Sequence, residues 1–155
     1  MKKIISFIAL LSIVASASAI ANPVESEKQA KAAIQFRQAI LQLVRSNMGP
    51  MGAMAKGDIP YDSEVMMVNS QRIEQLGLMM EDYFAADTRA FDLETGAKDN
   101  IWTNQEDFNK KAENMVMAAI QVQEVASAGM TDDYRKSIGA LGATCKACHD
   151  DYKKD

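Results

Sequence analysis

The sequence predicts an all-α protein, an antiparallel four-helix bundle around one core. Four segments of the chain repeat apolar residues three and four positions apart, which is the spacing of one helix face. Breaker-rich or non-periodic stretches separate these segments, and no stretch of useful length alternates apolar and polar residues as a strand would. Four amphipathic helices with short or modest links pack most simply as an antiparallel bundle.

Residues 1–21 have the pattern of a cleaved secretory signal. Lys2 and Lys3 open it, a short apolar run follows, and small residues come next. The apolar run is shorter than the about 20 residues that a membrane span needs. Cleavage is expected after Ala19 or Ala21, so we expect a periplasmic protein whose single domain covers residues 22–155.

The net negative charge of the chain bears on which classes of molecule the protein can bind. The formal net charge is −4 and becomes −6 once Lys2 and Lys3 are removed. An acidic surface repels the phosphate backbone, which argues against a nucleic-acid partner. No second apolar segment of spanning length is present, so no membrane span is expected in the mature protein.

The first helix is predicted from about Val24 to Met48, and Gly49-Pro50 is expected to end it. Its apolar stripe consists of Ile34, Leu41, Val44 and Met48. Several glycines and prolines between residues 49 and 61 predict an irregular connection.

The second helix is expected to begin after a cap at Asp62 or Ser63 and to run to about Phe84. Its apolar positions are Val65, Val68, Ile73, Leu76, Met80 and Phe84. Residues 85–102 lose the periodicity and contain several charges, so a loop is predicted there.

The third helix is predicted from a capping box, Thr103-Asn104-Gln105-Glu106, to a stop at Gly129. Thr131 is expected to cap the fourth helix, with Asp132 and Asp133 in its first turn. The apolar seam of this helix is formed by Tyr134, Ile138, Leu141, Cys145, Cys148 and Tyr152. Both cysteines thus occupy core positions of the predicted bundle.

The only two cysteines and the only histidine fall within five residues, Cys145-Lys146-Ala147-Cys148-His149. In the C-x-x-C-H pattern two thiols add to the vinyl groups of one haem, and the imidazole reaches the iron. On a helix these three side chains share one face. A thioredoxin-like pair, part of a zinc site or a disulfide are the alternatives, but no βαβ context is found and a closed zinc site needs a fourth ligand. The motif therefore predicts one covalently attached haem c.

The sequence resembles the cytochrome c′ family, the high-spin branch of the class II c-type cytochromes, over essentially the whole mature chain. The residues that carry the resemblance are Phe36-Arg37-Gln38 with Leu41, Pro60-Tyr61-Asp62, Thr95 to Ile101-Trp102, and the motif that ends at His149. The resemblance implies a left-handed four-helix bundle, which is often a homodimer through the first two helices. It also implies that the protein binds nitric oxide.

The resemblance also implies that His149 is the only protein ligand of the iron and that Leu41 covers the opposite face. Leucine has no lone pair, so a five-coordinate iron is expected, which nitric oxide or carbon monoxide reaches by displacing Leu41. Dioxygen would be held poorly because leucine offers no hydrogen-bond donor. In the low-spin branch a methionine at this position completes six-coordination.

Five further residues receive roles from the resemblance alone. Arg37 and Gln38 would hold a haem propionate, Thr95 would lie near the haem edge, Phe84 would form an aromatic distal wall, and Lys153 would lie beside the proximal imidazole. Members carry arginine or lysine there, and lysine replaces a flat guanidinium by a mobile point charge. Without the resemblance, Leu41 is an ordinary core residue, and Arg37 and Gln38 are surface residues. Phe84 and Trp102 are interpreted as packing residues even in a haem protein.

Eleven methionines keep a thioether ligand open as an alternative. Met48 lies seven residues after Leu41, about 10.5 Å along a helix, so both cannot face one iron. Eight others are interpreted as flexible core filler: Met51, Met54, Met66, Met67, Met79, Met80, Met115 and Met117.

The sequence therefore predicts one function and leaves a second open as the alternative. The first is a haem protein that binds nitric oxide and carbon monoxide, with a redox role through partner proteins as an addition. The second is a six-coordinate electron-transfer cytochrome of class II. An enzyme is not expected, because no acid, base or nucleophile beyond His149 is placed to act.

Overall fold

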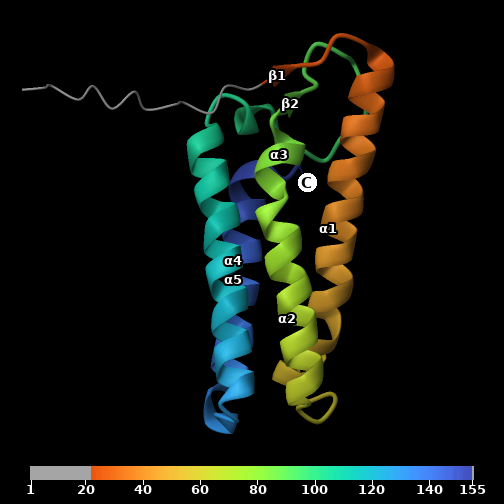
Figure 1. The fold of residues 1–155 in the computed structure, drawn as a ribbon. Coiled ribbons are helices and arrows are strands. Elements are labelled where there is room, and N and C mark those ends of the chain that lie inside the picture. Colours follow the sequence, from red (N-terminus) through yellow and green to blue (C-terminus); the bar gives the residue numbers. More distant parts are fainter. Residues whose placement is uncertain (1–21, 155) are drawn as a thin grey trace, which may run out of the picture.

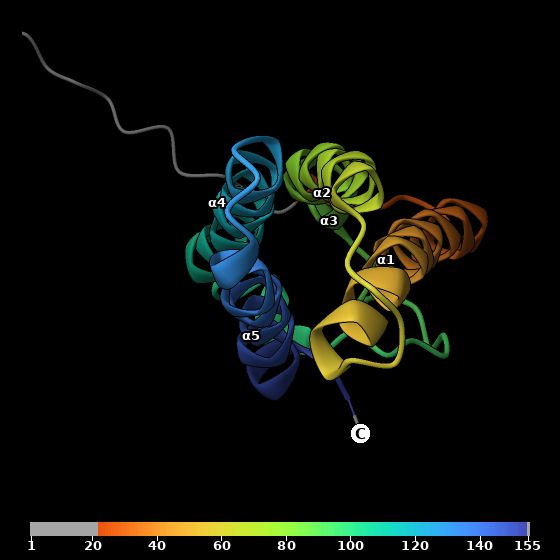
Figure 2. The ribbon, with the colours of Figure 1, turned by 90° about the horizontal axis from the view of Figure 1, so that it is seen from below.

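The computed structural model describes residues 22–154, and the predicted signal sequence, residues 1–21, lies outside the described residues. Four long helices form an up-and-down bundle (Figure 1). They are α1 (Glu27–Lys56), α2 (Ser63–Leu78), α4 (Gln105–Ser127) and α5 (Tyr134–Tyr152), and the short α3 (Met80–Phe84) extends α2. Seen along the bundle, α1, α2, α4 and α5 follow one another around a centre (Figure 2). The predicted fold class is confirmed.

Helix α1 does not end at Gly49-Pro50, so that prediction is wrong. Proline inside a helix removes one backbone hydrogen bond and costs about 3 kcal/mol. The helix continues because Met51 and Met54, which follow the proline, are fully buried, and each such burial contributes about 1.5–3 kcal/mol. It ends at Gly57, whose φ of 85° suits glycine and whose N–H donates to the carbonyls of the preceding turn.

The second predicted helix begins where expected and is then interrupted. Asp62 Oδ1 accepts from the backbone N–H groups of Glu64 at 2.9 Å and Val65 at 3.0 Å, which confirms this cap. The helix is interrupted at Met79, between α2 and α3. The prediction of a single helix that runs to Phe84 is therefore only partly correct.

The predicted loop 85–102 contains two short elements. The strand β2 (Ala86–Asp87) pairs in parallel with β1 (Asn22–Pro23), and a 3₁₀ turn, η1, covers Asp99–Ile101. The strand pairing connects Asn22–Pro23 to the segment before α4, over more than sixty residues, which local sequence does not reveal.

Two predicted helix caps are wrong. Thr103 donates its hydroxyl hydrogen to the carbonyl of Asn100 at 3.4 Å, so Asn104 becomes the N-cap of α4 and makes no side-chain capping bond. Thr131 opens a 3₁₀ turn, η2 (Thr131–Asp133), and α5 begins after it at Tyr134. In both cases a 3₁₀ turn stands next to the helix and moves its start.

The core follows the predicted apolar stripes of the helices. On α5 the seam residues Tyr134, Ile138, Leu141 and Tyr152 are buried, while the two cysteines of the same seam are half-buried. None of the helices within residues 22–154 combines the length and the apolar character that crossing a membrane requires.

Candidate cofactor site

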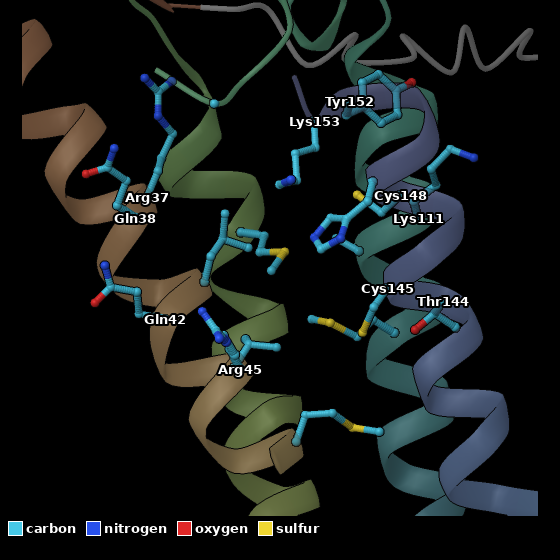
Figure 3. Close-up of a pocket in the computed structure, with 18 of the residues that line it drawn as sticks. Arg37, Gln38, Gln42, Arg45, Lys111, Thr144, Cys145, Cys148, Tyr152 and Lys153 are labelled. Atoms are coloured by element: carbon cyan, nitrogen blue, oxygen red, sulfur yellow. The ribbon is translucent and has the colours of Figure 1, made fainter. Parts of the chain in front are cut away.

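A cavity of about 870 Å³ lies between α1 on one side and α4 with α5 on the other (Figure 3). This volume falls in the range of cofactor and ligand pockets. The structure brings all the site residues predicted from the sequence to its lining: Arg37, Gln38, Leu41, Phe84, Thr95, Cys145, Cys148, His149 and Lys153. These residues come from three helices, one loop and the end of the chain, so the fold gathers them into one place.

The α5 wall carries the C-x-x-C-H motif on successive turns of one helix. Cys145 and Cys148 are half-buried free thiols, and the Cys145 Sγ lies 3.6 Å from the carbonyl oxygen of Leu141. Burial raises the pKa of both thiols, that of Cys148 to about 11, although Lys111 opposes the rise. Both cysteines are therefore neutral S–H groups at neutral pH. His149 is exposed at the cavity.

The α1 wall presents Leu41, which is 40% exposed, together with polar neighbours. Gln42 and Arg45, labelled in Figure 3, also line the cavity, and sequence reasoning missed them. Helical spacing could have predicted the position of Arg45, because it lies four residues, about one helical turn, after Leu41 on the same face. The α1 wall is thus more polar than the expected set of Arg37, Gln38 and Leu41.

Arg37 is only 3% exposed, so its interpretation as a surface residue is wrong. Its guanidinium donates to the carbonyl of Ala86 at 3.2 Å and to Thr88 Oγ1 at 3.0 Å. The guanidinium carbon lies 5.0 Å from the ring centre of Trp102 and 5.5 Å from that of Phe84. Burial lowers the pKa of Arg37 to about 10. This arginine fastens α1 to the segment that contains β2.

The loop end of the cavity is fixed by backbone contacts. Thr95 Oγ1 accepts from the N–H of Ala97 at 3.2 Å, and Ala97 forms an antiparallel bridge with Lys153. The N–H of Lys154 donates to the carbonyl of Gly96 at 2.8 Å. The loop that holds Thr95 therefore lies beside the residues that follow His149.

Polar side chains of α4 also reach this site, and sequence reasoning missed them. Lys111 lines the cavity and forms an ion pair with Asp151 at 2.8 Å, and Asp107 accepts a hydrogen bond from Tyr152 at 2.6 Å. Burial and Asp107 together raise the pKa of Tyr152. The sequence held no signal for these pairs, because each joins residues about forty positions apart on two helices.

A four-helix bundle that presents two thiols and an imidazole from one helix face to a mainly apolar cavity defines a c-type haem protein. The donor set and the cavity volume fit one such group. A sequence model of the family described as Cytochrome C' matches residues 32–153. The chain therefore belongs to the cytochrome c′ family, and haem c is its cofactor.

Known proteins agree with this assignment in sequence and in fold. The cytochrome c′ of Alcaligenes xylosoxydans xylosoxydans is 32% identical over 122 residues, which cover 79% of this chain and 93% of the relative. The solved cytochrome c′ of Shewanella frigidimarina is 29% identical with a TM-score of 0.74, over 84% of this chain and all of the other. A nitric oxide complex of a variant of the Alcaligenes xylosoxidans protein is 29% identical with a TM-score of 0.71, over 81% of this chain and 96% of the other.

Proposed function

We propose that this protein binds small diatomic gases, chiefly nitric oxide and also carbon monoxide, at a five-coordinate haem iron in the periplasm. The observation that carries the proposal is Leu41 on the α1 wall of the cavity, with His149 on the α5 wall. A hydrocarbon side chain cannot donate an electron pair to a metal, so this wall leaves room for a neutral gas.

Each residue of the motif has a separate task in this proposal. Cys145 and Cys148 tether the haem by thioether bonds, and His149 is the proximal ligand. When bound, haem supplies an iron atom to which nitric oxide and carbon monoxide bind. The mainly apolar lining of the cavity favours a neutral gas over water, and Leu41 has to move before a gas can enter.

Four residues at the edge of the cavity receive supporting roles. Gln38 is exposed at the lining and free to approach a propionate, whereas the guanidinium of Arg37 already donates to Ala86 and Thr88. We therefore assign propionate binding first to Gln38 and retain Arg37 for its unused N–H donors. Thr95 and Lys153 complete the rim.

The nitric oxide complex of the Alcaligenes relative supports nitric oxide as the first ligand to test. We propose ligand binding rather than catalysis, because His149, the imidazole of the motif, is committed to the iron.

The absorption spectrum of the reduced holoprotein tests the proposal. A five-coordinate high-spin spectrum that changes on addition of nitric oxide is expected. Sharp, split low-spin bands in the absence of added ligand would contradict it, because they require a sixth ligand from the chain.

A six-coordinate electron-transfer cytochrome is the second candidate, and one observation favours it. Met48, Met80 and Met115 all line the cavity, so thioether sulfur is present at the site. If low-spin bands are found, single replacements of these methionines by leucine identify the ligand, since only the coordinating residue abolishes the bands.

We also propose a homodimer through α1 and α2. Phe36 and Leu43 on α1 and Leu78 on α2 are more than half exposed, and Leu43 borders a shallow groove with Val68 and Leu76 of α2. Unpartnered apolar side chains of this kind mark contact surfaces. Leu43→Glu should convert dimer to monomer in sedimentation, and an unchanged mass would contradict this interface.

The periplasmic location rests on the signal pattern of residues 1–21. Mass spectrometry of the mature protein should find Ile20 or Asn22 as the first residue. An intact Met1 would contradict export through a cleaved signal.

A further inference from the structure

The last turn of α5, which carries His149, is tied to α4 by a buried tyrosine. Tyr152 donates its hydroxyl hydrogen to Asp107 Oδ2 at 2.6 Å and accepts from Asn104 Nδ2 at 3.0 Å. Its ring packs edge-on against Phe108, with the ring centres 5.3 Å apart. Both the ring and the hydroxyl of Tyr152 are therefore held by the first turn of α4 and the residue before it.

Lys111 adds a second tie one turn further along α4. Its Nζ lies 2.8 Å from Asp151 Oδ2 and 3.8 Å from Asp107 Oδ2, so one ammonium group lies between a carboxylate of α5 and the carboxylate that binds Tyr152. The Lys111 side chain is 20% exposed, so solvent screens this pair less than a surface pair. Figure 3 shows Lys111, Cys148 and Tyr152 close together at the cavity.

The backbone of the same turn is fixed from the loop. The carbonyl of Tyr152 accepts from the N–H of Lys98 at 2.9 Å, and the carbonyl of Asp151 accepts from Asn100 Nδ2 at 3.1 Å. The last carbonyls of a helix have no partner within the helix, so such external donors decide whether the end frays. Here the end of α5 is held on two sides.

We infer that Asp107 and Lys111 are positioning residues for His149. Through Tyr152 and Asp151 they fix the rotation of the last turn of α5, and a side chain on a helix turns with its helix. They thereby set the direction from which the imidazole meets the iron. The inference rests on the proposed role of His149 as iron ligand and extends it to residues of α4 that do not contact the metal.

The test compares two neighbouring lysines of α4 in the holoprotein. Lys111→Met removes the tie to Asp151 and Asp107, and Lys110→Met is the matched control. Lys110 is exposed and pairs only with Glu113 of its own helix at 2.7 Å among the residues that the structure describes. Tyr152→Phe is the third variant, since it keeps the ring and removes the hydroxyl.

Two measurements report on the last turn of α5, one on the orientation of His149 and one on local opening of the helix. The iron–histidine stretching band of the ferrous protein, measured by resonance Raman spectroscopy, reports the orientation of the proximal ligand. Amide hydrogen exchange of the last turn of α5 reports its opening. Lys111→Met and Tyr152→Phe should shift or broaden the band and speed exchange by about tenfold, whereas Lys110→Met should match the wild type.

A conservative variant separates positioning from general stability. Lys111→Arg keeps the charge pair and should restore the band. A Lys111→Met protein that loses thermal stability but keeps the wild-type band overturns the inference, as does an equal shift in Lys110→Met. If the Tyr152→Phe protein does not fold, the Lys111→Met protein alone tests the inference. Lys111 is not a core residue, so its replacement should leave the fold intact.

Failure of the proposed function gives a different result. A low-spin spectrum in the wild type contradicts the five-coordinate iron and abolishes the iron–histidine band as a readout. Amide exchange and the reduction potential then test the inference, and equal values in Lys111→Met and Lys110→Met overturn it.

Discussion

The two walls of the cavity are held in different ways. On the α5 wall, the turn that carries His149 is tied to α4 and to the loop through side-chain and backbone bonds of Asp151 and Tyr152. On the α1 wall, Gln42 and Arg45 make no side-chain hydrogen bond or ion pair to any residue among 22–154. The turn that carries His149 is thus fixed by directional bonds. The α1 wall has such bonds only at Arg37, and beyond it Leu41, Gln42 and Arg45 line the cavity with side chains that are free to change rotamer.

This difference separates two requirements of a gas-binding site. A metal ligand has to stay in one orientation, which hydrogen bonds and ion pairs provide. An entry path has to open and close, which a hydrocarbon side chain such as Leu41 permits, because displacing it breaks no directional bond. Four predictions test this comparison, beginning with the largest expected effect.

The fixed wall should be indispensable for cofactor retention. The double replacement Cys145→Ala with Cys148→Ala removes both thioether bonds, so the haem should be completely extractable by acidic acetone. The mass of the polypeptide should then lack the haem. A cofactor that survives extraction would show that the attachment lies elsewhere.

The mobile wall should control access to the iron. Leu41→Ala shortens the side chain that covers the cavity, and carbon monoxide association, followed by flash photolysis, should accelerate about tenfold, which corresponds to about 1.4 kcal/mol of barrier. Met117→Ala is the matched control, because Met117 is 63% exposed on α4 and is not among the residues that line the cavity. Equal rates in wild type and Leu41→Ala would remove Leu41 from the entry path.

The upper end of the α1 wall should depend on Arg37. Arg37→Met leaves the carbonyl of Ala86 and the hydroxyl of Thr88 without their donor, at a cost of about 2–4 kcal/mol. Thermal unfolding followed by circular dichroism should show a Tm lower by roughly 10 °C. Arg45→Met, which removes a guanidinium without such bonds, should change the stability by less than about 0.5 kcal/mol. Similar losses in both variants would contradict the anchoring role.

Acid should weaken the same region slightly. The side-chain hydrogen bond from Arg89 lowers the pKa of Asp87 below its ordinary value of 3.8. A lowered carboxyl pKa contributes stability above the unfolded pKa, and this contribution is lost as the pH falls through the folded pKa. Between pH 5 and pH 2, Arg89→Leu should therefore lose less stability than the wild type, by less than about 1 kcal/mol. Parallel denaturation curves at every pH would contradict this coupling.

The sequence predicted those features that depend on short spacing. The C-x-x-C-H motif, the α5 seam and the Asp62 cap each involve residues within one or a few turns of a helix, where periodicity and local hydrogen bonding decide the structure. The resemblance to a known family added Arg37, Leu41 and Thr95, which spacing alone would have left as ordinary residues.

The features that the sequence did not reveal depend on contacts between distant segments. Burial of Met51 and Met54 carries α1 past Pro50, although the local signal favours a stop there. Arg37 bonds to residues 49 and 51 positions away, and Tyr152 to a residue 45 positions away. Such pairs follow from how helices pack, which periodicity does not specify.

Pro50 has a mechanical consequence for the cavity. Because proline has no amide hydrogen, the carbonyl of Ser46 lacks its usual helical partner, and α1 bends most easily there. This point lies between the turn of Leu41 and the buried Met51 and Met54 that pin the lower end. The missing backbone hydrogen bond thus lies between two anchored parts of α1, with Arg37 on one side and the buried Met51 and Met54 on the other, so flexing at Pro50 is confined to the stretch between them.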